Sequence, residues 1–134
     1  GLKDFQQLAI IKNMVKQLQL PVEIVPCAII REKSGLAMSS RNERLSEDAR
    51  KKAALIYKTL KQAKTLFKTK SAKEVCLFVT KTFEKHPEFN LEYFTIADEA
   101  TLLPCTRKSK SKKYRGFIAI FIDNIRLIDN ISMK

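Results

Sequence analysis

Several residue types are scarce in this 134-residue chain, which contains one histidine, three cysteines, three glycines and no tryptophan. A single histidine excludes a zinc site that needs two histidines from this chain. The few glycines argue against a fold built from many tight turns, such as a β-sandwich. A hydrophobic content of 45% excludes a disordered chain. These limits leave a globular fold of one domain, or of one domain and part of another.

The cysteines, Cys27, Cys76 and Cys105, are widely spaced and form no Cys-x-x-Cys pair. A structural zinc site is therefore not expected, and no metal site is predicted. Cys27 and Cys76 lie in apolar runs, where a free cysteine behaves as a small hydrophobic residue. We expect reduced thiols in a cytoplasmic protein, because no signal peptide is visible and no apolar run is long enough for a membrane span.

The first thirty residues predict one helix and one strand. Apolar residues recur at helical spacing from Phe5 to Leu18, which predicts a helix over about 3–18 that ends before Pro21. The run 22–30 is almost continuously apolar, as in a strand of a parallel sheet that is covered on both faces. Pro26 within the run indicates an edge or a break. We expect a helix–strand unit of an α/β fold whose partner strands are not in this chain.

The remainder of the chain predicts helices and strands in separate blocks, so the expected fold class is α/β with an α+β part after residue 30. The expected elements are a loop over 31–45, a helix over about 47–68 with Ser46 as its N-cap, a second helix from a capping box at Ser71–Glu74 to Pro87, and strands over 91–97, 116–122 and 126–131.

Positive charge dominates, since 26 lysines and arginines stand against 14 acidic residues, for a net charge of +12. Six of the basic residues lie within 107–115, and most of the others are predicted on the exposed faces of the two middle helices. We interpret the basic segment as a solvated hairpin loop. A nucleic-acid interface is less favoured, because Tyr114 is the only aromatic residue there for base stacking. An anionic small molecule is the other alternative.

Two short clusters have residue types suited to a nucleotide. Lys3, Asp4 and Gln7 begin the first helix, where free N–H groups and a lysine suit phosphate and a carboxylate can accept hydrogen bonds from ribose. The segment 35–42 contains Ser39-Ser40-Arg41, whose hydroxyls and guanidinium suit polyphosphate oxygens. On spacing alone each pattern is weak, because a Lys-Asp helix start is usually charge matching to the helix dipole and Ser-Ser-Arg is usually an ordinary loop.

Four segments, in this order, resemble the C-terminal part of the pantoate–β-alanine ligase (pantothenate synthetase) family: Lys3-Asp4-Phe5-Gln6-Gln7-Leu8, Pro21-Val22-Glu23-Ile24-Val25, the stretch from Arg31-Glu32 through Gly35-Leu36-Ala37-Met38-Ser39-Ser40-Arg41-Asn42 to Leu45-Ser46, and Arg126-Leu127-Ile128-Asp129-Asn130. The resemblance implies an ATP-dependent ligase that condenses pantoate with β-alanine through a pantoyl adenylate and releases pyrophosphate and AMP. It implies that residues 1–30 end a Rossmann-like nucleotide-binding domain. Residues 31–134 would form a C-terminal lid domain with helices over a short antiparallel sheet.

The resemblance also implies roles at individual positions. The residues expected to act on the triphosphate during catalysis are Lys3, Ser39, Ser40 and Arg41. The other expected ATP-binding residues are Gly1 and Asp4 at the ribose, Ile30 and Met38 near the adenine, and Leu2, which replaces the family's usual glutamate and would act through its backbone. Gln7 would bind pantoate. Mg²⁺ would arrive with the ATP phosphates.

The family's His-x-Gly-His motif has no counterpart here, since His86 is the only histidine and is predicted at a helix end or surface. The resemblance therefore implies an N-terminal half of the same enzyme as partner, a homodimer for the full-length enzyme, and little activity for the isolated chain. The segment Thr106–Arg115 is more basic than the family leads us to expect. The alternatives left open are a basic nucleic-acid-binding module and a purely structural domain.

Overall fold

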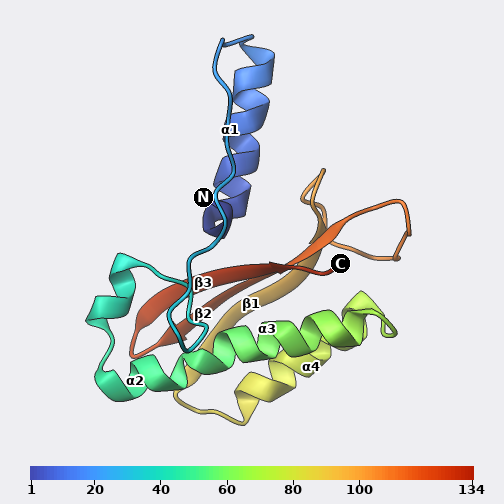
Figure 1. The fold of residues 1–134 in the computed structure, drawn as a ribbon. Helices are drawn as coiled ribbons and strands as arrows, with labels where there is room; N and C mark the ends of the chain where they lie inside the picture. Colours follow the sequence, from blue (N-terminus) through green and yellow to red (C-terminus); the bar gives the residue numbers. More distant parts are fainter.

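The computed structural model describes residues 1–134, and Figure 1 shows an arm that projects from a body of helices and strands. In chain order the elements are a 3-10 turn (Leu2–Asp4), α1 (Phe5–Gln17), a second 3-10 turn (Ser40–Arg44), α2 (Glu47–Lys52), α3 (Ala54–Phe67), α4 (Ala72–Glu84), β1 (Phe89–Asp98), β2 (Tyr114–Ile122) and β3 (Ile125–Ser132). The arm consists of α1 and the chain that returns beside it. None of the helices has the length and apolar character needed to cross a bilayer.

The body is an antiparallel sheet of order β1-β2-β3, with α3 and α4 packed on one face (Figure 1). The core lies between these layers and includes Ile56, Leu60, Val75, Val79, Ile96, Ile118 and Ile120, none more than 2% exposed. The opposite face of the sheet is covered in part by the start of α1, where the rings of Phe5 and Phe117 pack edge to face with centroids 5.7 Å apart. The predicted α+β arrangement of helices over a short antiparallel sheet is confirmed.

Helix boundaries follow the predicted caps, with one interruption. Ser46 accepts a hydrogen bond from the Ala49 N–H, and Ser71 and Glu74 form the reciprocal capping box. The helix predicted over 47–68 is wrong in one respect, because it divides at Ala53 into α2 and α3. There the Ile56 N–H donates to the Ala53 carbonyl, a tighter i to i−3 bond that interrupts the regular ladder.

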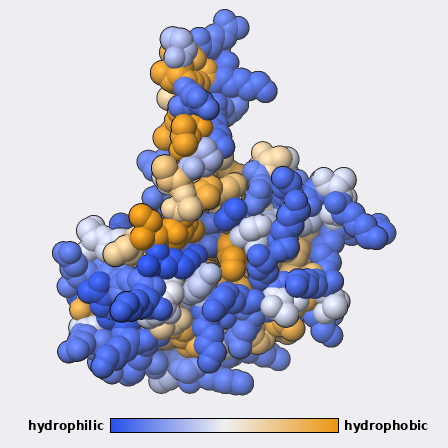
Figure 2. Space-filling view, viewed as in Figure 1, coloured by the Kyte–Doolittle hydropathy of each residue, from blue (hydrophilic) through white to orange (hydrophobic).

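The strand predicted over 22–30 is wrong for this structure. These residues run back beside α1 without strand pairing, and the backbone tie from the Leu2 N–H to the Cys27 carbonyl is 2.8 Å long. A strand covered on both faces needs neighbouring strands and a layer on each face, and the described chain provides only α1 beside this run. Val25 and Ile30 are consequently exposed, and so is Cys27. Figure 2 shows apolar residues along this projecting arm. All three cysteines are free thiols.

The basic segment between β1 and β2 is only partly a solvated loop. Lys108 Nζ donates to the carbonyls of Phe67 and Lys70 at 2.6 and 2.8 Å, which satisfies carbonyls at the C-terminal end of α3. Arg115 forms a 3.0 Å ion pair with Glu99. Lys108 and Arg115 therefore help to stabilise the fold, a role that the sequence pattern did not indicate. His86 follows the end of α4 with 41% of its side chain exposed, as predicted.

Replacing Thr59 by valine is expected to leave stability unchanged or raise it by about 1 kcal/mol. Thr59 is fully buried in α3, and its hydroxyl has no hydrogen-bond partner, so valine removes an unsatisfied polar atom. Thr82→Val is the matched control, because its hydroxyl donates to the Phe78 carbonyl at 2.8 Å and stability should fall. Urea unfolding of both variants checks this. A clear loss of stability for Thr59→Val would contradict the prediction.

Candidate functional site

The two clusters singled out in the sequence meet in the structure. The Lys3 ammonium donates a hydrogen bond to the Met38 carbonyl at 3.3 Å, across 35 residues of sequence. Lys3 and Met38 thus join the start of α1 to the loop before α2. A cavity of about 300 Å³ opens beside this contact, lined by Lys3, Asp4, Ser39, Ser40, Arg41, Arg126, Leu127 and Ile128. The cavity places two hydroxyls and three cations around one space.

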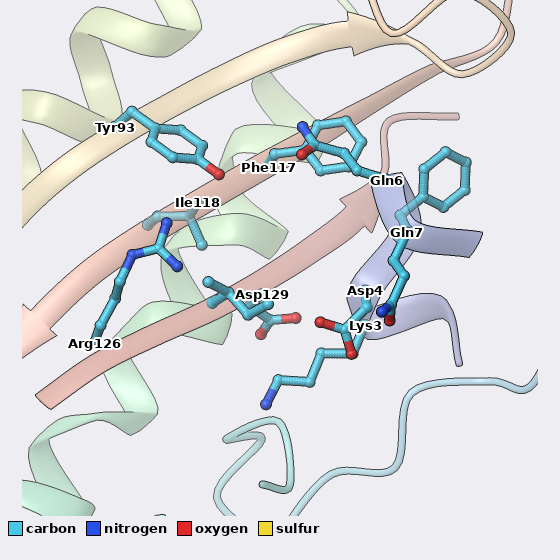
Figure 3. Close-up of a pocket in the computed structure, with 11 residues that line it drawn as sticks. Lys3, Asp4, Gln6, Gln7, Tyr93, Phe117, Ile118, Arg126 and Asp129 are labelled. Carbon is cyan, nitrogen blue, oxygen red and sulfur yellow. The ribbon is translucent and has the colours of Figure 1, made fainter. Parts of the chain in front are cut away.

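A second cavity, of about 210 Å³, adjoins the first and shares Lys3, Asp4, Arg126 and Ile128 with it. Gln7 lies on its wall, one helical turn after Lys3 (Figure 3). Tyr93 of β1 and Phe117 of β2 provide part of the opposite wall, so this cavity is more apolar than its neighbour. Gln7 is therefore near the charged cavity but outside it.

The loop that holds the serines is shaped by a tight turn at Gly35. Arg31 and Ala37 form an antiparallel bridge, and the Gly35 N–H donates to the Glu32 carbonyl at 2.9 Å. Gly35 has a φ of +96°, and a Cβ at this position would lie 2.5 Å from Cδ2 of Tyr57. Only glycine fits this turn, because a side chain would be both strained and in collision with the ring.

Ser39 and Arg41 are anchored by the 3-10 turn that follows the loop. The Ser39 hydroxyl accepts from the Arg41 N–H at 3.2 Å, and Arg41 Nη1 donates to the Arg126 carbonyl of β3 at 3.1 Å. Asn42 is 1% exposed and donates to Glu32 Oε2 and to the Ala37 carbonyl. The loop is thus held by the side-chain bonds of Asn42 and by the packing of Leu36 and Leu45 in the core.

The four remaining expected ATP-binding residues line neither cavity. Ile30 and Met38 are 70% and 52% exposed, and the Met38 N–H donates to the Ile30 carbonyl at 2.9 Å. Because they face each other across the Arg31–Ala37 bridge, their side chains lie on one side of that bridge. Gly1 and Leu2 precede Lys3 in its turn, and Leu2 lines a different cavity beside α1.

Lys3 is the cavity-lining cation whose pKa is lowered. Partial burial lowers the pKa of the Lys3 ammonium, and the nearby Arg41 lowers it further, while Asp4 and Asp129 act in the opposite direction. The loss of hydration therefore outweighs the stabilisation of the Lys3 charge by the two carboxylates. No group of three or more histidine, cysteine, aspartate and glutamate side chains is arranged to hold a metal ion.

Sequence reasoning missed several residues of the site. Arg126 lines both cavities and pairs with Glu92 of β1 at 2.9 Å. Asp129 lines the second cavity, and Asn130 contacts the backbone of the Lys3 turn. The signal was present, because all three belong to the segment 126–130 that carries part of the family resemblance, but nothing in the sequence showed what they contact.

Comparison with known proteins bears on this arrangement. The family model described as Pantoate-beta-alanine ligase matches residues 1–132. The chain belongs to the pantoate–β-alanine ligase family. Similar curated relatives are named pantothenate synthetase, from Flavobacterium psychrophilum, 62% identical over 134 residues, and from Christiangramia forsetii, 53% identical over 134 residues. Each alignment covers 100% of this chain but only 48% and 47% of the relative, so the chain spans about half the length of the curated relatives it matches.

Solved structures of this ligase family share the fold. The pantothenate synthetase from Thermus thermophilus superimposes with a TM-score of 0.89 at 36% identity, covering 99% of this chain and 48% of that one. A pantoate–β-alanine ligase from Francisella tularensis gives a TM-score of 0.66 at 29% identity and covers 99% of this chain and 42% of that one. The Francisella protein was solved in complex with Beta-gamma ATP and Beta-alanine.

Proposed function

We propose that this chain provides the triphosphate-binding surface and lid of an ATP-dependent pantoate–β-alanine ligase. The observation that carries the proposal is the cavity at which Lys3 and Asp4 meet Ser39, Ser40 and Arg41. Hydroxyl and cationic donors around one space suit a polyphosphate. Family membership and the nucleotide complex of the Francisella relative support ATP as the ligand.

The proposed reaction has two steps. A carboxylate oxygen of pantoate attacks the α-phosphorus of ATP, the bond from that phosphorus to the β-phosphate oxygen breaks, and pyrophosphate leaves. The amine of β-alanine then attacks the acyl carbon of the pantoyl adenylate, loses a proton, and AMP leaves with the electrons of the broken acyl–oxygen bond. Catalysis by this chain consists of positioning and charge stabilisation.

Most of the residues to which we assign roles line one of the two cavities. Lys3, Ser39, Ser40 and Arg41 bind the triphosphate and offset the charge that develops as pyrophosphate leaves. Gln7, on the wall of the adjoining cavity, binds pantoate. Asp4 and Gly1 contact the ribose, Leu2 acts through its backbone, and Ile30 and Met38, exposed side by side, flank the adenine. Mg²⁺ enters on the ATP phosphates as part of the substrate.

The domain division belongs to the proposal as well. Residues 1–30 would complete a Rossmann-like domain, and residues 31–134 would form the lid. The His-x-Gly-His motif and the rest of the substrate contacts would come from an N-terminal half of the same enzyme, so the 134-residue chain alone is expected to be inactive. The homodimer and the cytoplasmic location implied by the resemblance stay predictions.

Two assays test this function. The full-length enzyme that carries this chain is expected to form pantothenate from ATP, pantoate and β-alanine, and to exchange labelled pyrophosphate into ATP only when pantoate is present. The 134-residue chain is expected to do neither. Absence of both activities in the full-length enzyme would overturn the proposed function. Turnover by the isolated chain would instead overturn the division of the site between two halves.

A further inference from the structure

The C-terminal end of β3 carries two adjacent buried polar residues that the proposed chemistry does not use. Asn130 is 1% exposed, and its side-chain amide donates to the carbonyls of Leu2 and Lys3 at 2.8 and 3.0 Å. Its own oxygen accepts from Arg115 Nη1 at 2.7 Å, which fixes the orientation of the amide. Both donors of one side chain therefore hold the backbone of the turn that carries Lys3.

Asp129 holds the loop that carries the second cluster, Ser39-Ser40-Arg41, through Arg31. Its carboxylate receives two hydrogen bonds from the Arg31 guanidinium, at 2.6 and 2.9 Å, with 3% of the Asp129 side chain exposed. Arg31 Nη1 also donates to the Gly35 carbonyl at 3.1 Å, and its guanidinium stacks 3.7 Å from the centre of the Tyr57 ring. Asp129 thus fixes the loop that leads to Met38 and the serines.

The two side chains serve different segments because successive strand residues point to opposite faces of a sheet. Asn130 is opposite Phe117 in the register with β2, and Phe117 packs against Phe5 at the start of α1. Asp129 is opposite Ile118, which belongs to the core beneath α3 and α4. One dipeptide consequently holds two segments that are about thirty residues apart in sequence.

We propose that Asp129 and Asn130 are positioning residues that hold the Lys3 turn and the Met38–Arg41 loop at the separation the triphosphate requires. This inference rests on the proposed function. Lys3 has a long side chain with many rotamers, and its reach toward Met38 and the phosphates depends on where its backbone is held. The Asn130 amide donates to the backbone of the turn that carries Lys3, and Lys3 is the phosphate-binding side chain of that turn.

A coupling experiment in the full-length enzyme tests the Asn130 half of the proposal. Asn130→Ala is expected to lower kcat/KM for ATP in the pyrophosphate exchange by about 10- to 100-fold. In an enzyme that already carries Lys3→Met, the same change should lower the exchange by a clearly smaller factor, because the phosphate-binding group that it positions is absent. The KM for β-alanine in the complete reaction should stay unchanged. Ser132→Ala, two residues along the same strand, is the matched control and should leave the exchange rate unaltered.

Asp129→Asn tests the second half in the same way, since it keeps the shape of the side chain but removes the charge that holds Arg31. Its cost should shrink when Arg41→Ala is already present. If Asn130→Ala yields no folded enzyme, Asn130→Asp replaces it, because this variant keeps an acceptor for Arg115 and loses the two donated bonds. If Asn130→Ala lowers kcat/KM by the same factor in the wild-type enzyme and in Lys3→Met, the positioning role is overturned, while the proposed function still stands. A wild-type enzyme without exchange activity would instead mean that the proposed function itself has failed.

Discussion

Replacing Lys3 by methionine is expected to lower pantoate-dependent ATP–pyrophosphate exchange in the full-length enzyme by about 10²- to 10³-fold. Methionine keeps most of the length of the side chain but removes the charge that faces the cavity of Ser39–Arg41. A preorganised charge is most effective where negative charge develops, so kcat should fall more than the affinity for ATP. Lys16→Met, an exposed lysine on α1, is the control and should retain the wild-type rate.

The pH dependence of the exchange provides a second check on Lys3. Because partial burial lowers the pKa of its ammonium, the charged form is lost as pH rises, and at a lower pH than for a free lysine. Exchange should therefore decline on the alkaline side, and Lys3→Arg should move that decline to higher pH, since arginine stays charged. A rate that Lys3→Met leaves unchanged would contradict the role given to this residue.

The local signals in the sequence predicted much of the body of the fold. Ser46 and the Ser71–Glu74 capping box mark helix starts that the structure reproduces, because these bonds join residues within one turn. The strand predicted over 22–30 is wrong because its evidence was not of this local kind. Its apolar pattern describes the environment of a sheet, and a sheet depends on neighbours that a local pattern cannot provide. Lys108 likewise contacts the end of α3 across about 40 residues of sequence.

The candidate site was predictable as two separate clusters but not as one cavity. Residue types identified Lys3 and Ser39–Arg41, yet the contact between Lys3 and Met38 depends on how the arm is attached to β3. Asn130 makes part of that attachment, beside the ring contact of Phe5 with Phe117, and the residue types alone do not predict either contact. Arg126 could not be assigned to the site from sequence either, because an arginine in a strand usually forms a surface ion pair, as Arg126 does with Glu92.

Arg31→Met is expected to destabilise the 134-residue chain by about 3–5 kcal/mol near pH 8. It removes both hydrogen bonds from Arg31 to Asp129 and leaves that carboxylate buried with no charged partner, only the Asn130 N–H as a donor. Arg126→Met is the matched control, since its ion pair with Glu92 also has two hydrogen bonds but lies at the surface, and the loss of stability should be much smaller. Urea unfolding of both variants gives the comparison.

The pH dependence of this loss separates an unpaired charge from lost packing. Burial already raises the pKa of Asp129 against the opposing effect of Arg31, and without Arg31 the pKa must rise further. The folded variant then holds a proton that the unfolded chain gives up, so its stability increases as pH falls toward the ordinary range of an aspartate. The deficit relative to wild type should therefore be smaller at pH 5 than at pH 8, and Arg31→Met combined with Asp129→Leu should recover much of it at both. A deficit that is the same at both pH values would show that the carboxylate charge is not what Arg31 compensates, and that the loop is held mainly by the stacking of Arg31 on Tyr57.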